Sequence, residues 1–118
     1  MADDWKIVKK VKDAWKEFKA IPLPDMPNSN PELEEVWYVI SDFDEVVSGY
    51  VGSVIALGRF SDAEKRDIKE AFMQSLEDCK TALGNIKTFK PSNAKEKKEV
   101  KELTDRLEAT IEVADSFM

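Results

Sequence analysis

The chain has 118 residues, of which 42 % are hydrophobic and 36 % are charged. This length suits one domain, residues 1–118, that buries a core without disulfide or metal, and the low glycine content favours helix. The net charge of −6 argues against nucleic acid as a partner, because such binding depends on basic residues facing phosphates.

An amphipathic helix is predicted over residues 3–20, because apolar residues recur there every three or four positions. These residues are Trp5, Val8, Val11, Trp15 and Phe18. Lysines occupy the other faces, and we expect the apolar stripe to pack in a core rather than lie on a membrane. Residues 21–30 contain three prolines, which exclude a helix and predict a connection that can extend ~30 Å.

The second helix is predicted to begin with Asn30 as N-cap and Pro31 at the first helical position. Acids follow in its first turn, where the helix dipole favours negative charge. The apolar pattern continues to about Gly58, and its second half is apolar nearly all round, which is typical of a helix covered on several sides. This helix is either continuous or breaks near Ser41 or Gly49, which would give five helices instead of four.

The third helix is predicted to start at a capping box formed by Ser61 and Glu64. Its apolar stripe includes Cys79, and the pair Gly84 and Asn85 is the expected stop. Because Cys79 lies within the apolar stripe, we expect a buried and unreactive thiol.

A fourth helix is predicted after Pro91, with Ser92 or Asn93 as its cap and Glu96 placed to complete the cap. Its apolar residues recur at a nearly heptad spacing as far as Phe117. Four helices with one long proline-rich connection, between the first two, predict an all-α four-helix bundle.

The location expected from the sequence is the cytoplasm, with no transmembrane segment. The N-terminus carries acids where a secretory signal carries basic residues, and no apolar run follows them. The longest uncharged stretch, residues 46–58, is shorter than the ~20 residues that span a bilayer. The lone cysteine forms no disulfide within the chain, which is compatible with a reducing compartment.

The residue types that most enzymes depend on are scarce. The chain has no histidine, which removes the commonest general base and the commonest transition-metal ligand. One cysteine without histidine excludes a zinc cage built on thiolates. The sequence has no phosphate-binding glycine loop, nucleophile elbow or calcium loop. We therefore predict a protein that is not an enzyme and that uses no metal or cofactor.

Asp44 is the first candidate functional residue, because an unbroken second helix would direct its carboxylate into the core. An unpaired buried carboxylate is costly. Three interpretations follow: a Lys or Arg of another helix pairs with it, residues 41–44 cap a new helix, or it lines a polar pocket. The third makes the protein a carrier of a small molecule or lipid. That pocket would be lined by Trp37, Phe43, Asp44, Tyr50 and Phe72.

A second candidate feature is a group of small residues in the second helix, on the side roughly opposite the main apolar stripe. The group comprises Gly49, Gly52, Ser53 and Ala56. Each glycine inside a helix lowers its stability by up to ~1 kcal/mol relative to alanine, so two glycines within four residues require an explanation. We expect close packing against another helix of the chain, a homodimer seam, a ligand groove, or a kink.

The third candidate is an acidic group with one aromatic residue. Residues 31–60 contain six acids and one arginine, so most of the negative charge is concentrated there. The group comprises Glu32, Glu34, Glu35, Tyr38, Asp42 and Glu45. It is either a solvated face or a docking surface for a basic partner protein, in which the charges speed association and Tyr38 supplies contact area.

The function predicted from the sequence is that of a non-enzymatic protein-interaction module, with an inhibitory or regulatory role. In size, acidity and expected fold the chain resembles bacterial immunity proteins, which bind and block a toxin. This is a general likeness that no motif carries, and what it implies is a binding role.

Overall fold

The computed structural model describes residues 2–56 and 60–117, and it describes side chains from residue 6 onward. The predicted place of the Trp5 side chain on the apolar stripe and the predicted helix end at Gly58 lie outside this part of the chain. Four α-helices and a short 3-10 helix make up the regular structure of the described residues. They are α1 (Ala2–Ala20), α2 (Pro31–Ile55), α3 (Asp62–Thr88), α4 (Ala94–Ala114) and η1 (Asp115–Phe117). The predicted all-α four-helix bundle is confirmed.

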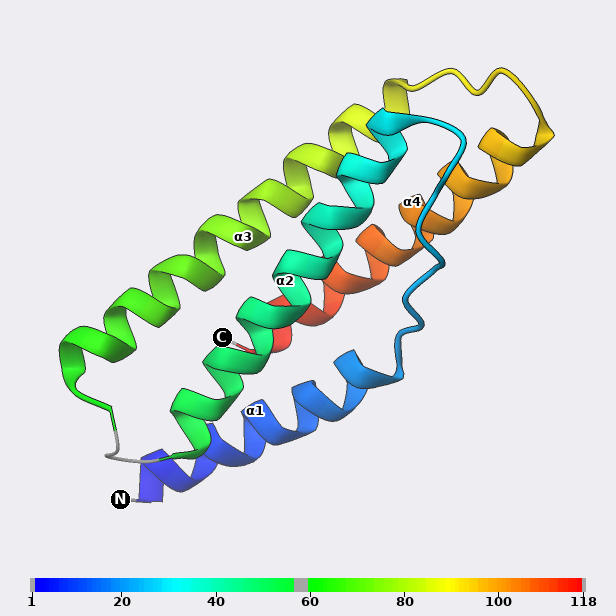
Figure 1. Cartoon of the computed structure of the whole chain (residues 1–118). Helices are drawn as coiled ribbons and strands as arrows, with labels where there is room; N and C mark the ends of the chain where they lie inside the picture. Colours follow the sequence, from blue (N-terminus) through cyan, green and yellow to red (C-terminus); the bar gives the residue numbers. More distant parts are fainter. Residues whose placement is uncertain (1, 57–59, 118) are drawn as a thin grey trace.

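The long helices α2 and α3 run antiparallel, side by side, along most of the molecule (Figure 1). The shorter helix α4 packs against both α3 and α2, along the half in which α2 begins. Helix α1 packs against α2 and α4, along the half in which α2 ends. The result is an elongated bundle with extents of 55 × 24 × 19 Å.

The connection of residues 21–30 follows the bundle from the end of α1 to the start of α2 (Figure 1). Its backbone is held by α2, because the Trp37 indole N–H donates to the Pro24 carbonyl at 2.7 Å. It is also held by α4, because the Glu99 carboxylate accepts from the Asn28 N–H at 3.3 Å and from the Ser29 hydroxyl. The predicted long connection is therefore a packed segment of the fold.

The starts of α2 and α3 follow the capping rules that predicted them. The Asn30 side chain accepts the Glu32 N–H at 2.8 Å. At the start of α3, the Ser61 hydroxyl accepts the Glu64 N–H at 3.1 Å and the Glu64 carboxylate accepts the Ser61 N–H at 3.4 Å. Each bond satisfies a backbone donor that has no partner within its helix.

The start of α4 carries a similar reciprocal cap. Asn93 is the N-cap, and its side chain accepts the Glu96 N–H at 2.8 Å. The Glu96 carboxylate accepts the Ser92 N–H at 2.8 Å, and this bond lowers the pKa of Glu96 because it favours the ionised form.

The structure decides two helix boundaries that the sequence left open or predicted wrongly. Helix α2 continues without a break through Ser41 and Gly49, so the four-helix alternative is the correct one. The predicted stop of the third helix at Gly84 and Asn85 is wrong, because α3 continues to Thr88. The extra turn buries Ile86 and leads to Phe89, which packs against the core. That apolar burial outweighs the weak helix propensity of glycine and asparagine.

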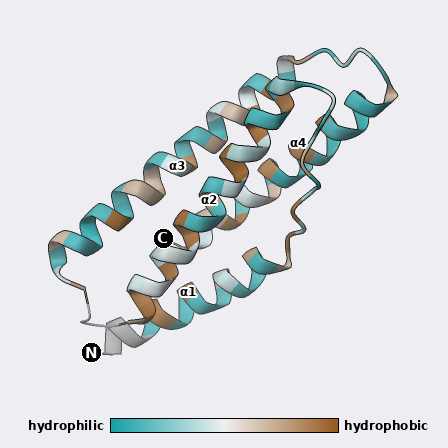
Figure 2. Ribbon diagram, in the orientation of Figure 1, coloured by the Kyte–Doolittle hydropathy of each residue, from teal (hydrophilic) through white to brown (hydrophobic). Residues whose placement is uncertain are grey.

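The core lies where the apolar stripes of the helices meet, and α2 contributes the most hydrophobic ribbon (Figure 2). Val8, Val11 and Phe18 of α1 are buried, as their spacing predicts. An aromatic cluster occupies the centre, and η1 brings the last of its rings back into the core. Its members are Phe18, Phe43, Tyr50, Phe72 and Phe117.

Candidate functional site

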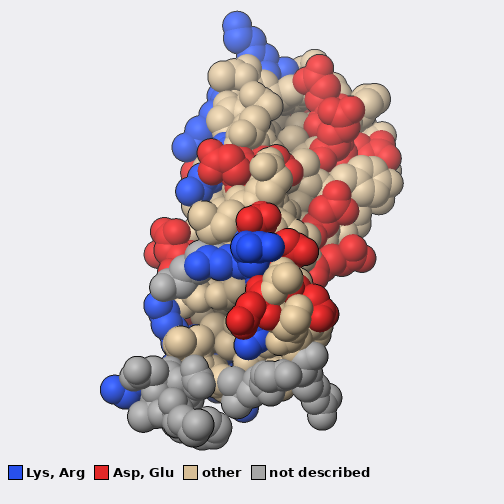
Figure 3. Space-filling model, turned by 90° about the vertical axis from the view of Figure 1, so that its left-hand side faces the viewer, with Lys and Arg blue, Asp and Glu red and all other residues tan. Residues whose placement is uncertain are grey.

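The predicted acidic group lies on the outward side of α2. At 100° per residue, all of its members except Glu32 fall within about 100° of arc, and Glu32 lies beside them on the side toward α3. Glu34 is partly buried and the other members are exposed. Every ion pair within the described residues lies elsewhere, and none includes one of these acids. Figure 3 shows Asp and Glu side chains gathered along one edge of the molecule.

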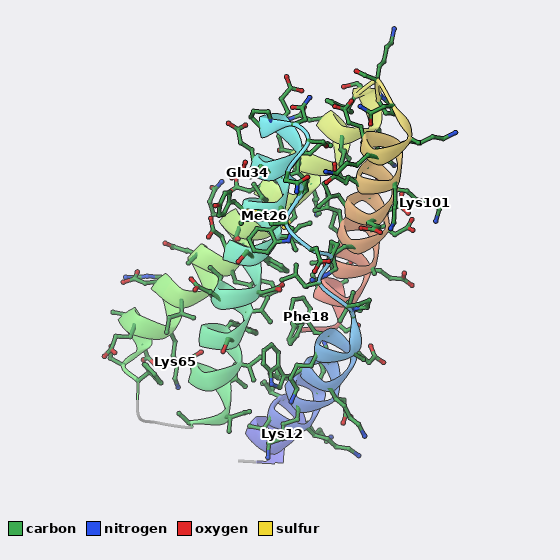
Figure 4. All side chains as sticks on the ribbon, turned by 45° about the vertical axis from the view of Figure 1, so that its right-hand side comes forward. Lys12, Phe18, Met26, Glu34, Lys65 and Lys101 are labelled. Carbon is green, nitrogen blue, oxygen red and sulfur yellow. The ribbon has the colours of Figure 1, made fainter. Side chains whose placement is uncertain are left out.

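Exposed apolar side chains accompany these acids. Tyr38 is 47 % exposed, and Met26 of the connection is 42 % exposed. The Tyr38 hydroxyl lies 4.0 Å from the Met26 sulfur, and its ring meets the Trp37 ring edge-on at 5.5 Å. Met26 and Glu34 lie on the same side of α2 (Figure 4). We call the surface formed by Glu34, Glu35, Tyr38, Asp42, Glu45 and Met26 the acidic–aromatic face.

Met26 is the member that sequence reasoning missed. It is separated from Tyr38 by eleven residues of chain, and nothing in its local pattern places it on α2. The one available signal was that a loop long enough to follow the bundle must cover some helix surface.

The aromatic residues of the predicted pocket are arranged differently from the prediction. The fully buried rings of Phe43 and Phe72 lie 5.4 Å apart, and the Tyr50 ring lies 4.9 Å from that of Phe72. These three rings pack against one another and occupy the space in which the pocket was predicted. Trp37 is separate from them, because its indole faces Pro24 of the connection. The structure therefore brings together three of the four rings as packed core.

Asp44 has the first of its three predicted environments, an ion pair with a cation of another helix. The Arg106 guanidinium donates to Asp44 at 2.7 Å from α4. Arg106 is only 4 % exposed. Its Nε donates to the Thr110 hydroxyl at 2.9 Å, and its guanidinium lies 5.6 Å from the Phe18 ring centre. Burial raises the pKa of Asp44, and Arg106 offsets part of that rise.

One atom of this cluster stays without a partner: Arg106 Nη1 is buried and makes no hydrogen bond within the described residues. Sequence reasoning did not single out Arg106. Its place on the buried stripe, three residues after Leu103 and four before Thr110, was the available signal.

Cys79 is fully buried in the middle of α3. Burial raises the pKa of its thiol to about 12, with smaller contributions from the charges of Asp44 and Asp78. The thiolate is therefore essentially absent at neutral pH, and the thiol is unreactive.

The close helix packing predicted at the small residues of α2 is absent from the described structure. A Cβ atom added to Gly49 or Gly52 would meet nothing within 4 Å. Both glycines are exposed, and they continue the outward side of α2 beyond the acids. Ser53 is buried, with its hydroxyl donating to the Tyr50 carbonyl at 2.7 Å, and Ala56 caps the helix end. The intrachain close-packing prediction is wrong at Gly49 and Gly52, because no helix among the described residues covers this side.

Two of the cavities formed by the described residues lie beside the helices. The larger has a volume of about 770 Å³ and lies between the first half of α2 and the second half of α3. We call it the α2–α3 groove, and its lining includes Glu35, Val36 and Val39 of α2 and Asp78, Thr81 and Ala82 of α3. The smaller, of about 260 Å³, lies between α1, α2 and α3 and is lined by Tyr50, Ser53, Lys65 and Lys69 with apolar neighbours.

No protein-family model matches the chain, and no curated protein or solved structure is significantly similar to it. Among the described residues, no group of three or more Asp, Glu or Cys side chains is arranged to hold a metal ion. None of the described helices combines the length and the apolar character needed to cross a membrane.

Proposed function

We propose that the protein is a non-enzymatic binding module that recognises a basic partner protein through the acidic–aromatic face. The observation that carries this proposal is the exposed contact between Tyr38 and Met26, surrounded by carboxylates that have no cation partner within the described structure. Exposed aromatic and methionine side chains supply contact area, and unpaired like charges supply steering and specificity.

The electrostatics of the chain support the same proposal. The −5 charge of residues 31–60 is presented mostly on one side of α2, so its field adds up rather than cancels. A basic partner would meet the acids at the rim and the Tyr38 ring at the centre, which is the arrangement that most protein interfaces use. Its association would slow as salt is added.

The test compares two charge reversals with the same spacing. Asp42→Lys with Glu45→Lys changes the acidic–aromatic face, and Asp67→Lys with Glu70→Lys makes the matched change on exposed residues of α3. Tagged wild type and both variants would be used to capture proteins from the source cells, with quantitative mass spectrometry as the readout. We expect the α2 variant to lose the partner and the α3 variant to keep it.

Equal capture by the wild type and the α2 variant would contradict the proposal. The melting temperatures of all three proteins, measured by circular dichroism, guard against loss through unfolding.

A cytoplasmic location is a further part of this proposal, and a second copy of the chain is the alternative to a basic partner. The location is supported by a single buried thiol that needs no oxidising compartment. A homodimer is supported by the bare helix surface at Gly49 and Gly52, which would let another backbone approach. Sedimentation over a range of concentrations separates a homodimer from a different partner.

A second candidate function is the binding of an amphipathic anion, such as a fatty acid. The observation that favours it is the smaller cavity, where Lys65 and Lys69 accompany Ile7, Val8 and Val54. Cations at an apolar cavity suit a carboxylate with a hydrocarbon tail. Native mass spectrometry of gently purified protein would show the extra mass of such a ligand. A bare polypeptide mass would contradict this candidate.

A further inference from the structure

The α2–α3 groove has the dimensions of a helix-binding site. Its lining extends over eight residues of α2, from Glu32 to Val39, and over the second half of α3 from Asp78 onward. At 1.5 Å per residue, the α2 part alone is about 12 Å long, which corresponds to two turns of a bound helix. The two helices that form its walls run side by side over this length (Figure 1).

The floor of the groove is apolar and already partly covered. Val36 and Val39 of α2 pack against the core from the outside, and the buried Ala82 of α3 also lines the groove. An apolar floor at a spacing of three and four residues matches the apolar stripe of an amphipathic helix, which places its side chains at the same intervals.

The charges around the groove are mostly negative. Glu32, Glu35 and Asp78 contribute carboxylates, and Lys90 contributes the one cation among the described lining residues. Within the described residues, none of the three acids forms an ion pair, and Asp78 accepts one hydrogen bond, from the Gln74 amide at 3.1 Å. An acidic rim repels phosphates and anionic lipid head groups and attracts lysine and arginine.

We propose that the α2–α3 groove binds a basic amphipathic helix of the partner protein. This inference rests on the proposed function, and it names the partner element that the protein would recognise. The partner helix would place apolar residues on Val36, Val39 and Ala82, with its basic residues facing the acids of the rim. Glu35 belongs to both the groove and the acidic–aromatic face, so the two surfaces form one continuous interface.

Thr81 offers a sharp test, because it is exposed, lines the groove and carries no charge. Thr81→Lys introduces a cation and Thr81→Glu introduces an acid, and both residues suit an exposed helix position. The probe is a fluorescent 14-residue amphipathic Lys/Leu helix, with a Glu/Leu helix of identical pattern as control. We expect Thr81→Lys to weaken binding of the Lys/Leu probe about tenfold and Thr81→Glu to strengthen it about threefold in fluorescence anisotropy.

A second measurement places the bound probe. In amide NMR spectra titrated with the Lys/Leu helix, we expect the largest shifts at Val36, Val39 and Ala82. Absence of binding, equal binding of the Glu/Leu helix, equal affinity of the two Thr81 variants, or shifts located away from the groove would each overturn the inference.

The outcomes separate this inference from the proposed function. If the probe fails to bind while Asp42→Lys with Glu45→Lys still abolishes partner capture, the groove assignment alone is wrong. If the probe binds in the groove while that variant captures the partner normally, the proposed role of the acidic–aromatic face alone is wrong.

Discussion

Three carboxylates lie within four residues of α2 and have two different environments. Asp44 points inward and is hydrogen-bonded to Arg106 of α4, which lies 62 residues further along the chain. Asp42 and Glu45 point outward and have no ion-pair partner within the described structure. The inward charge joins α2 to α4 through its bond to Arg106. The outward charges contribute little to the fold and remain available to another molecule.

The largest expected effect comes from breaking the inward pair. Asp44→Leu leaves the buried Arg106 guanidinium without its carboxylate, and we expect a loss of about 3 kcal/mol in the free energy of unfolding. Asp44→Leu combined with Arg106→Leu removes both charges, and we expect it to stay within about 1 kcal/mol of the wild type. Urea unfolding of the two variants measures this. A single variant as stable as the double one would show that the pair does not hold the helices.

The exposed glycines of α2 give the next largest effect. Because nothing lies near the position of an added Cβ, Gly49→Ala and Gly52→Ala should each raise the free energy of unfolding by up to ~1 kcal/mol. Thermal unfolding at low protein concentration measures the monomer. Destabilisation would mean that this surface is covered. A loss of stability seen only at high concentration would indicate a homodimer that needs the bare backbone.

The Glu96 cap predicts a smaller effect that depends on pH. Its pKa is lowered in the folded protein, so its ionised form stabilises the fold above the pKa of an unfolded glutamate, and this contribution disappears as the pH falls through the lowered value. We expect Glu96→Gln to destabilise the protein at pH 7, and to destabilise it less below pH ~4, where an unfolded glutamate is protonated. A difference that stays constant with pH in urea unfolding would contradict the role of the charge.

The smallest expected effect on stability belongs to the outward acids. Asp42→Lys with Glu45→Lys should change the free energy of unfolding by no more than about 0.5 kcal/mol, because both side chains are exposed and unpaired. The same unfolding assay that reveals the loss in Asp44→Leu measures this. A loss comparable to that of Asp44→Leu would remove the distinction between inward and outward charges.

The features that sequence reasoning predicted correctly are local ones. Asn30, Ser61 and Asn93 bond to backbone groups two or three residues away, so their caps are visible in a short window of sequence. The buried stripe of α1 follows from spacing alone, since its pattern already specifies a face. The class of fold follows from counting such helices and from the length of the one long connection.

The features that sequence reasoning missed depend on contacts between distant residues. The choice of Arg106 as the partner of Asp44 requires knowing how α4 packs against α2. The continuation of α3 past Gly84 depends on the core residues against which Ile86 packs. The exposed surface at Gly52 depends on the positions of the other helices, which leave it uncovered. For the same reason, the predicted group around Tyr38 lacked Met26, and the α2–α3 groove was not predicted.

The bonds of the connection divide it into two parts with different consequences. Pro24, Asn28 and Ser29 are held to α2 and α4, which leaves residues 21–23 as the short link to α1. If α1 detaches from the core, this short link keeps it close to the surface of its own chain from which it detached. Its effective concentration there is in the millimolar range, far above that of free chains in solution. The same chain will therefore recapture its own α1 before a neighbouring copy can exchange it.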